Sequence, residues 1–143
     1  MKRVLAAFLV GTMAIAGFSV NTAAYSNQSG IITVQDVNGG AKGAVLTVAS
    51  TKVTCTSFMS QSGGSIKSIK GTQTLEKRNS SNSYSAVSGK TWTETTNSTY
   101  LCISESVSGL SAGTYRLKTV FTVTLSNGKT ETTTVYSVAR TVK

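Results

Sequence analysis

The strongest constraint on the fold is an alternation of apolar and polar residues over positions 115–125. Every second residue from Tyr115 to Leu125 is apolar except Thr119, and the positions between them are mostly basic or threonine. This period of two is typical of an antiparallel β-strand with one buried and one wet face. Asn127-Gly128 follows, a dipeptide that supplies the two positive-φ residues of a type I′ turn. We therefore predict a hairpin whose second strand runs over 129–138.

The chain from residue 31 onward divides into further short segments of strand character, separated by Gly, Ser and Asn clusters. No segment repeats apolar residues at helical spacing with caps over a dozen positions. Threonines interleaved with apolar residues and the lack of proline argue against a disordered stalk. About seven strands predict an all-β fold, an antiparallel β-sandwich, with a closed barrel as the alternative. The other predicted strands are 31–37, 45–48, 52–59, 66–77 with a bulge near Gly71, 84–95 in two pieces around Gly89, and 99–107.

Residues 1–24 have the pattern of a secretory signal peptide. Lys2 and Arg3 precede an apolar run over 4–20, and small residues occupy positions 22 and 24. We expect cleavage after Ala24, with Ser26 as the alternative last residue of the leader. The remaining residues 25–143 form one domain of ordinary size. The alternative is an anchor that is retained, but the glycine-interrupted run is marginal for a bilayer span, so we expect a secreted, extracellular protein without stable membrane insertion.

The net charge of the chain is +9. Removing Lys2 and Arg3 from the 14 basic residues leaves 12 against five acidic ones, or +7 for the mature domain. A basic surface favours anionic partners such as wall polymers and acidic glycans. Because the lysines are scattered along the sequence, the charge is better explained by solubility than by a binding role, and nucleic acid is not the expected partner.

Cys55 and Cys102 are the two cysteines, and both lie in the mature domain. Export into an oxidising compartment normally closes such a pair, so we expect a disulfide between them. The alternation over 99–107 places Leu101 and Ile103 on one face and Cys102 on the other. Either Cys102 points outward, or a bulge shifts the register and turns it inward; the pattern leaves both open.

Catalytic chemistry has few candidates. Without histidine, the Ser-His and Cys-His nucleophile pairs and the usual zinc sites are excluded. Scattered carboxylates are typical of a solvated surface, although two of them could pair as acid and base in a hydrolase. We predict a non-catalytic protein without cofactor or metal. The carboxylates are Asp36, Glu76, Glu94, Glu105 and Glu131.

Aromatic and basic residues in the central region suggest a binding surface. Tyr84 and Tyr100, with Arg78 and Lys90, could stack on sugar rings and contact anionic groups. Trp92 lies in the same region, but we expect it to belong to the core.

Two resemblances add to this. The segment 110–115, Leu-Ser-Ala-Gly-Thr-Tyr, resembles the tyrosine corner of immunoglobulin-like and fibronectin-type domains, with Gly113 at the turn and Tyr115 as the tyrosine. It implies an immunoglobulin-like sandwich. Leu117 stands where antibody domains have their second cysteine, so it does not imply the antibody type.

From about Val45 onward the chain also resembles a group of short exported proteins from clostridia-like bacteria. The matching pieces are short: 75–78, Tyr84, Trp92, 113–118, 127–131 and Tyr136-Ser137. This resemblance implies secretion and this fold, and no activity.

The leading hypothesis is therefore a secreted binding or adhesion module for an anionic or carbohydrate polymer of a cell wall or host surface. A structural protein that self-associates through exposed strand edges is the alternative. A hydrolase is the third. Salt-sensitive retention on glycans, self-association at high concentration, or a pocket that joins two acids would distinguish the three.

Overall fold

The structure is a computed structural model that describes the chain over residues 23–25, 32–35, 40–63 and 65–143, and the side chains of the last two ranges. Most of the expected signal peptide and Asp36 lie outside these residues. Within them no helix is long and apolar enough to cross a membrane.

The described residues form ten β-strands and no helix. The predicted segments are found again, mostly longer than expected. Two short strands near the ends, over residues 23–25 and 140–142, were not predicted and bring the number to ten. The strands are β1 (Ala23–Tyr25), β2 (Ile32–Gln35), β3 (Ala41–Ala49), β4 (Lys52–Ser60), β5 (Ile66–Arg78), β6 (Tyr84–Thr96), β7 (Tyr100–Val107), β8 (Gly113–Leu125), β9 (Thr130–Tyr136) and β10 (Arg140–Val142).

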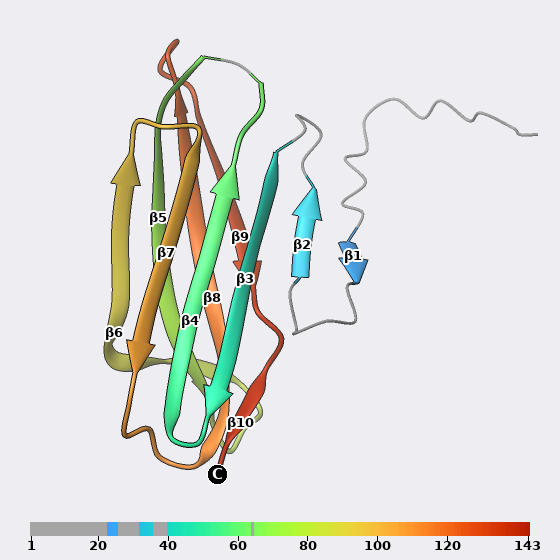
Figure 1. Cartoon of the computed structure of the whole chain (residues 1–143), viewed down its shortest axis with the longest axis vertical. Coiled ribbons are helices and arrows are strands. Elements are labelled where there is room, and N and C mark those ends of the chain that lie inside the picture. Colours follow the sequence, from blue (N-terminus) through green and yellow to red (C-terminus); the bar gives the residue numbers. More distant parts are fainter. Residues whose placement is uncertain (1–22, 26–31, 36–39, 64) are drawn as a thin grey trace, which may run out of the picture.

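The strands form two antiparallel sheets that pack face to face (Figure 1). The first, here called the β4 sheet, has the order β1-β2-β3-β4-β7. The second, the β8 sheet, has the order β10-β8-β5-β6, and β9 pairs with β8 on the same side as β10. The predicted all-β sandwich is thus confirmed.

The core lies between the sheets and takes inward-facing residues from both. Tyr115 and Phe121 of β8 are the largest fully buried side chains. Trp92 of β6 is half-buried and packs against this core, as expected. The buried apolar residues are Ala44, Leu46, Val53, Cys55, Met59, Ile69, Leu75, Leu101, Ile103, Val107, Tyr115, Leu117, Phe121, Val123, Val135 and Val142.

A small polar cluster crosses the core. The Ser57 hydroxyl of β4 donates to the Gln73 side-chain carbonyl of β5, and Gln73 Nε2 donates to the Cys55 carbonyl at 3.4 Å. Thr119 of β8 is the register partner of Gln73. Its buried hydroxyl has no hydrogen-bond partner among the described residues. Thr119, the one polar position in the apolar face of β8, thus lies beside Gln73 of this cluster.

The bulge predicted near Gly71 is wrong. Gly71 pairs regularly with Glu94 on one side and Phe121 on the other. A Cβ at this position would lie 2.8 Å from Ile103 Cδ1, so the glycine is required by the close approach of the two sheets. The irregularities of β5 lie instead at Ile66/Ser68 and Thr74/Glu76.

The second irregularity arises in β6. Thr74 pairs with Thr91 while Glu76 pairs with Ala86, so the intervening residues of β6 outnumber those of β5. Gly89 lies in this excess with a φ of 69°. The predicted division of this segment around Gly89 is therefore present as a register shift within the single strand β6. In Figure 1, β6 bends sharply at its lower end.

The β8–β9 hairpin is confirmed, but its predicted type I′ turn is wrong. Of the described residues in this turn only Gly128 has a positive φ, 82°. Gly128 N donates to Leu125 O at 2.9 Å, and Leu125 N donates to Lys129 O at 2.8 Å. Residues 125–128 thus form a four-residue turn whose last residue, Gly128, is left-handed, the arrangement of a G1 bulge. The Asn-Gly dipeptide is used, one position later than in a two-residue turn.

The predicted disulfide is also wrong, since both cysteines are free. Cys55 pairs with Glu105 and Cys102 pairs with Phe58 across the β4–β7 ladder. The cysteines are therefore an odd number of positions apart along the ladder, so their side chains leave opposite faces of one sheet. Cys55 is buried in the core and Cys102 is exposed. The first of the two orientations left open for Cys102 is the correct one.

Candidate functional site

The outer face of the β8 sheet carries most of the site. Strand alternation places the even-numbered residues of β8 on this face, and the neighbouring strands align with them in rows. One row reads Ala86, Glu76 and Arg116 across β6, β5 and β8. The next reads Thr91, Thr74, Lys118 and Tyr136 across β6, β5, β8 and β9.

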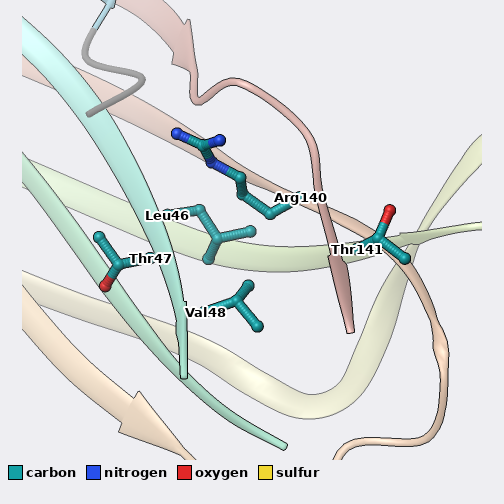
Figure 2. Close-up of a pocket in the computed structure, with 5 residues that line it drawn as sticks. All are labelled: Leu46, Thr47, Val48, Arg140 and Thr141. Carbon is teal, nitrogen blue, oxygen red and sulfur yellow. The ribbon is translucent and has the colours of Figure 1, made fainter. Parts of the chain in front are cut away.

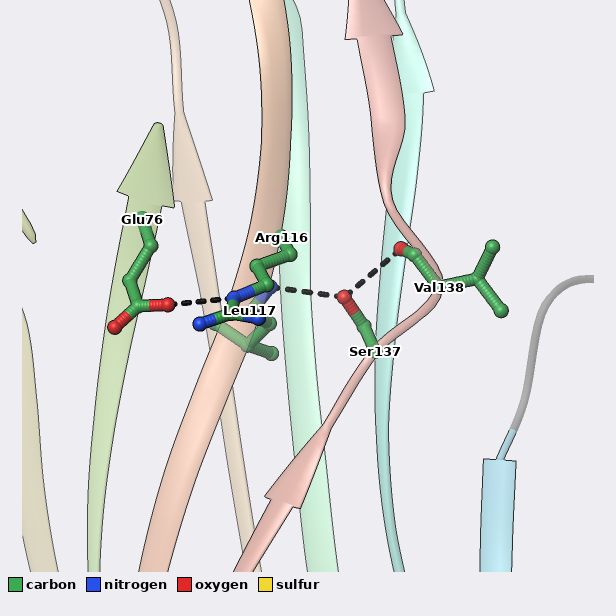
Figure 3. A network of polar contacts seen from close by, with 5 residues as sticks. All are labelled: Glu76, Arg116, Leu117, Ser137 and Val138. Carbon is green, nitrogen blue, oxygen red and sulfur yellow. Dashed lines mark hydrogen bonds and ion pairs between the residues drawn. The ribbon is translucent and has the colours of Figure 1, made fainter. Parts of the chain in front are cut away.

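Arg116 is held at the centre of this face by an ion pair. Its Nε lies 2.6 Å from Glu76 Oε2 and donates a hydrogen bond to it (Figure 3). The side chain of Glu76 is only 10% exposed, while that of Arg116 is 29% exposed. The carboxylate is therefore covered and acts as an anchor, and part of the guanidinium still reaches solvent.

Two tyrosine rings pack on the same guanidinium. Its central carbon lies 4.0 Å from the ring centre of Tyr84 and 4.4 Å from that of Tyr136. Tyr84 comes from β6 and Tyr136 from β9, which lie on opposite sides of β8. Both contacts are within cation–π distance. We call Glu76, Tyr84, Arg116 and Tyr136 the arginine clamp.

The arginine clamp holds the Arg116 guanidinium in place while its terminal N–H donors stay available to a ligand. A guanidinium carries five N–H donors in one plane, and here Nε is used by Glu76. Among the described side chains the two terminal nitrogens have no hydrogen-bond partner. Stacked rings and an anchored Nε fix the orientation of these nitrogens. Such a fork matches the paired oxygens of a carboxylate, sulfate or phosphate group.

Further cations surround the clamp on the same face. Arg78 is the register partner of Tyr84, and Lys118 is that of Tyr136. Because Glu76 neutralises one charge, Arg78 and Lys118 supply the local excess of positive charge. Two rows further along the face, Lys70 lies among threonines.

Threonine hydroxyls cover the rest of this face in hydrogen-bonded cross-strand pairs. Thr72 and Thr93 are 3.1 Å apart, and Thr91 donates to Thr74 at 3.2 Å. Thr122 and Thr132 are 3.3 Å apart on the β8–β9 side. Each pair shares one proton, so the second hydroxyl proton remains available to solvent or a ligand. The clamp therefore borders a polar, hydroxyl-rich surface.

Ser137 fixes the backbone beneath the clamp. The register between β8 and the edge formed by β9 and β10 slips by one residue after Tyr136. At the slip the Ser137 hydroxyl accepts a hydrogen bond from Leu117 N at 2.8 Å and donates to Val138 O at 3.0 Å (Figure 3). Leu117 and Ser137 follow Arg116 and Tyr136 directly, so these bonds hold the two strands that carry the stacked pair.

The segment that resembles a tyrosine corner lies at the start of β8. The Tyr115 hydroxyl donates to the Ser111 carbonyl at 2.7 Å. Lys77 lies across the corner: its Nζ is 2.8 Å from Ser111 Oγ and 5.4 Å from the Tyr115 ring centre. Gly113 has a φ of 154°, and a Cβ there would be 2.5 Å from Lys77 Cε. The corner is thus a packed structural unit next to the clamp.

The structure divides the four residues expected to form a binding surface. Arg78 and Tyr84 lie side by side at the clamp. Lys90 lies in the irregular part of β6. Tyr100 begins β7 in the other sheet, where it is 53% exposed. Arg78 and Tyr84 therefore belong to one surface, and Tyr100 does not.

Sequence reasoning missed Glu76, Arg116 and Tyr136. The observed hairpin register pairs Lys118 with Tyr136 and so brings Tyr136 diagonally beside Arg116. The two-residue turn predicted at Asn127-Gly128 would have paired Tyr136 with Thr119 on the core face, so the predicted hairpin did not indicate this contact. Glu76 reaches the site through β5, 40 positions away in sequence. No local pattern indicates that pairing.

The other described carboxylates are spread over the molecule. Glu94 lies on β6, Glu105 on β7 and Glu131 on β9. Glu131 lines a cavity of about 150 Å³ together with Lys42, Met59 and Gln61. Among the described residues no three His, Cys, Asp or Glu side chains are grouped closely enough to hold a metal ion.

No protein-family model, no curated protein and no solved structure matches this chain.

Proposed function

We propose that this chain is a secreted, non-catalytic module of immunoglobulin-like type that binds an anionic polymer through the outer face of its β8 sheet. A wall polymer or an acidic glycan of a host surface is the expected ligand. The observation that carries the proposal is the arginine clamp. Secretion rests on the leader pattern of residues 1–24 and on the resemblance to exported proteins.

The strand order supports the immunoglobulin-like assignment. Counting β3 to β9 as seven strands, the first, second and fifth share one sheet, and the third, sixth and seventh share the other. Immunoglobulin-type sandwiches divide their strands in this way. The fourth strand, β6, lies beside the third, as the additional strand of variable-type domains does. The Tyr115–Ser111 hydrogen bond is in the position of a tyrosine corner.

The clamp supports binding of an anion on physical grounds. A long arginine side chain normally loses rotamer freedom when a ligand fixes it. Here Tyr84, Tyr136 and Glu76 fix the guanidinium before any ligand arrives. Pre-ordering of this kind reduces the free-energy cost of binding. Tyrosine edges and threonine hydroxyls beside the fork are also groups that contact sugar rings and their hydroxyls.

The test compares polymers that differ in charge. The mature domain is applied to immobilised heparin, to polygalacturonate and to neutral dextran at increasing NaCl concentration. Retention on the two anionic polymers, lost as salt rises, is the expected result because exposed charge pairs are screened. Equal retention on dextran, or retention insensitive to 0.5 M salt, would contradict the proposal.

Variants locate the site. Arg116→Lys keeps the charge that faces Glu76 but loses the planar fork, so affinity should fall about tenfold while the fold is kept. Tyr136→Leu removes one stacked ring without touching the ion pair and should act in the same direction. Lys129→Gln, in the β8–β9 turn, is the control and should change only the salt dependence. An Arg116→Lys protein that binds like the parent would place the site elsewhere.

A further inference from the structure

An open groove lies on the opposite side of the sandwich from β6. It runs between β3 and β10 and has a volume of about 410 Å³ (Figure 2). Val48 supplies the accessible apolar surface, with the fully buried Leu46 of the core behind it, and Arg140 reaches across from the β10 side. Thr47 and Thr141 complete the lining.

Two sheet edges border this groove. In the described residues β2 pairs with β3 only over Ala41–Ala44, whereas β4 pairs with β3 over Lys42–Ala49. Among the residues that the structure describes, the second half of β3 thus has a ladder on one side only. Within the same part of the chain, β10 on the opposite side of the groove pairs with β8 alone. A strand edge with unpaired N–H and C=O groups is a template for another extended chain.

Arg140 gives the groove a charge. It is half-buried, and it makes no ion pair with any residue that the structure describes. Its register partner is Tyr115, so it lies on the inward-facing side of β10 at the rim of the core. A cation beside an apolar wall selects a ligand with one anionic group and apolar neighbours.

We propose that this groove is a strand-addition site for an extended peptide segment that carries a carboxylate. The peptide backbone pairs with β3 over residues 45–49. The apolar side chains on its inward-facing side lie beside Val48, and its carboxylate lies at Arg140. Main-chain pairing supplies affinity and the alternate side chains supply selectivity, as in other cases of added strands.

Charge complementarity favours an acidic peptide over a second copy of this chain. Two copies joined through their β3 edges would bring both Arg140 side chains to the same interface. Each mature copy also carries a net charge of +7. Like charges at a contact oppose association, whereas an acidic segment is attracted. The site is separate from the arginine clamp, so either can fail without the other.

The experiment uses a capped ten-residue peptide of alternating valine and serine with a central aspartate, titrated into the isotope-labelled mature domain. Amide shift changes should be confined to residues 45–49 and 140–142. Replacing the aspartate with asparagine should weaken binding about tenfold, because the ion pair with Arg140 is reduced to a hydrogen bond to a neutral oxygen. N-methylation of alternate peptide bonds should abolish binding, since it blocks the ladder.

Two variants keep the proposal falsifiable. Arg140→Gln should bind the aspartate and asparagine peptides equally, and Lys129→Gln, which removes a charge at the far end of the sandwich, should keep the tenfold preference. Thermal unfolding of both variants verifies that they are folded. Absence of binding, shift changes on another face, or an unaltered preference in Arg140→Gln would overturn the proposal. Concentration-dependent shifts at 45–49 without peptide would show that a second copy is the occupant.

Discussion

Burial raises the pKa of the Cys55 thiol from 9.0 to about 12, and the charge of Glu105, its partner across the ladder, acts in the same direction. Cys102 lies on the same pair of strands but is exposed to solvent. At the scale of single residues, the face of the sheet on which a side chain lies therefore decides its chemistry. Cys55 behaves as a small apolar core residue, and Cys102 is open to reagents.

This difference predicts an alkaline loss of stability. Between pH 9 and about pH 12 the folded protein keeps the Cys55 proton, whereas the unfolded chain has lost it. The free energy of unfolding should therefore be unaffected below pH 9 and fall above it, by at most about 1.4 kcal/mol per pH unit. Urea unfolding at pH values from 8 to 11 measures this decrease in the free energy of unfolding.

Lysines and tyrosines also titrate in this range, so the comparison is made between variants. Cys55→Ala should have a shallower decline than the parent protein, and Cys102→Ala should decline like the parent. Iodoacetamide should modify Cys102 in the native protein and Cys55 only after unfolding. Equal slopes for the two variants would show that the Cys55 proton is not linked to folding.

At the scale of elements, β5 shows how one strand determines the spacing of the sheets. It pairs with β6 and β8 on its two edges and faces β7 across the core at Gly71. The missing side chain allows Leu101, Ile103 and Phe121 to meet over its backbone. A strand with a side chain at this point would force the sheets apart.

Gly71→Ala should accordingly destabilise the protein by about 1–3 kcal/mol, as overpacking of a core does. The new Cβ would lie 2.8 Å from Ile103 Cδ1 and 2.9 Å from Leu101 Cδ2. Ile103→Val removes the nearer atom. This second change should cost less in the Gly71→Ala background than alone, and a double-mutant cycle in urea measures the difference. Additive effects would mean that the two residues do not compete for space.

The sequence predicted the positions of the strands better than the turns and the contacts between the strands. Alternation identified the β8–β9 hairpin, but the Asn-Gly dipeptide fits both a two-residue turn and the longer turn that is present. A glycine within a strand likewise signals either a bulge or a close approach, and at Gly71 only the second sheet decides. Alternation over 99–107 left open whether Cys102 points outward or, through a bulge, inward. The expected disulfide rested on the export of the chain and not on that pattern.

Long-range register explains why the clamp was found only in part. Arg116 and Tyr136 belong to one hairpin, but their proximity depends on the longer turn, since the predicted two-residue turn shifts the register by one residue. Glu76 on β5, and Tyr84 on the neighbouring β6, come close to Arg116 because β5 pairs with β8. Strands β6 and β7 separate β5 from β8 in the sequence. Pairings of this kind depend on the whole topology.

For the whole molecule, this topology predicts the folding kinetics. The β4–β7 and β5–β8 ladders join strands far apart in the sequence, and sandwiches of this kind fold in roughly milliseconds to seconds. The chain has no proline. Refolding from urea in the presence of reductant should therefore lack the phase of roughly 10–100 s that proline isomerisation produces. Stopped-flow fluorescence of Trp92 measures it, and a slow phase that a prolyl isomerase accelerates would contradict the prediction.

Because the two thiols lie on opposite faces of the β4–β7 ladder, a disulfide between them would show that the chain was oxidised before it folded or after it unfolded. In the native state a layer of polypeptide separates the sulfur atoms, so the bond between them can form only in a chain that has not yet folded or has come apart. Once formed, that crosslink would prevent the ladder from closing in its correct register. An intramolecular disulfide in a preparation of this protein would thus identify trapped, non-native molecules. Adding a reductant during refolding would increase the yield of the native fold.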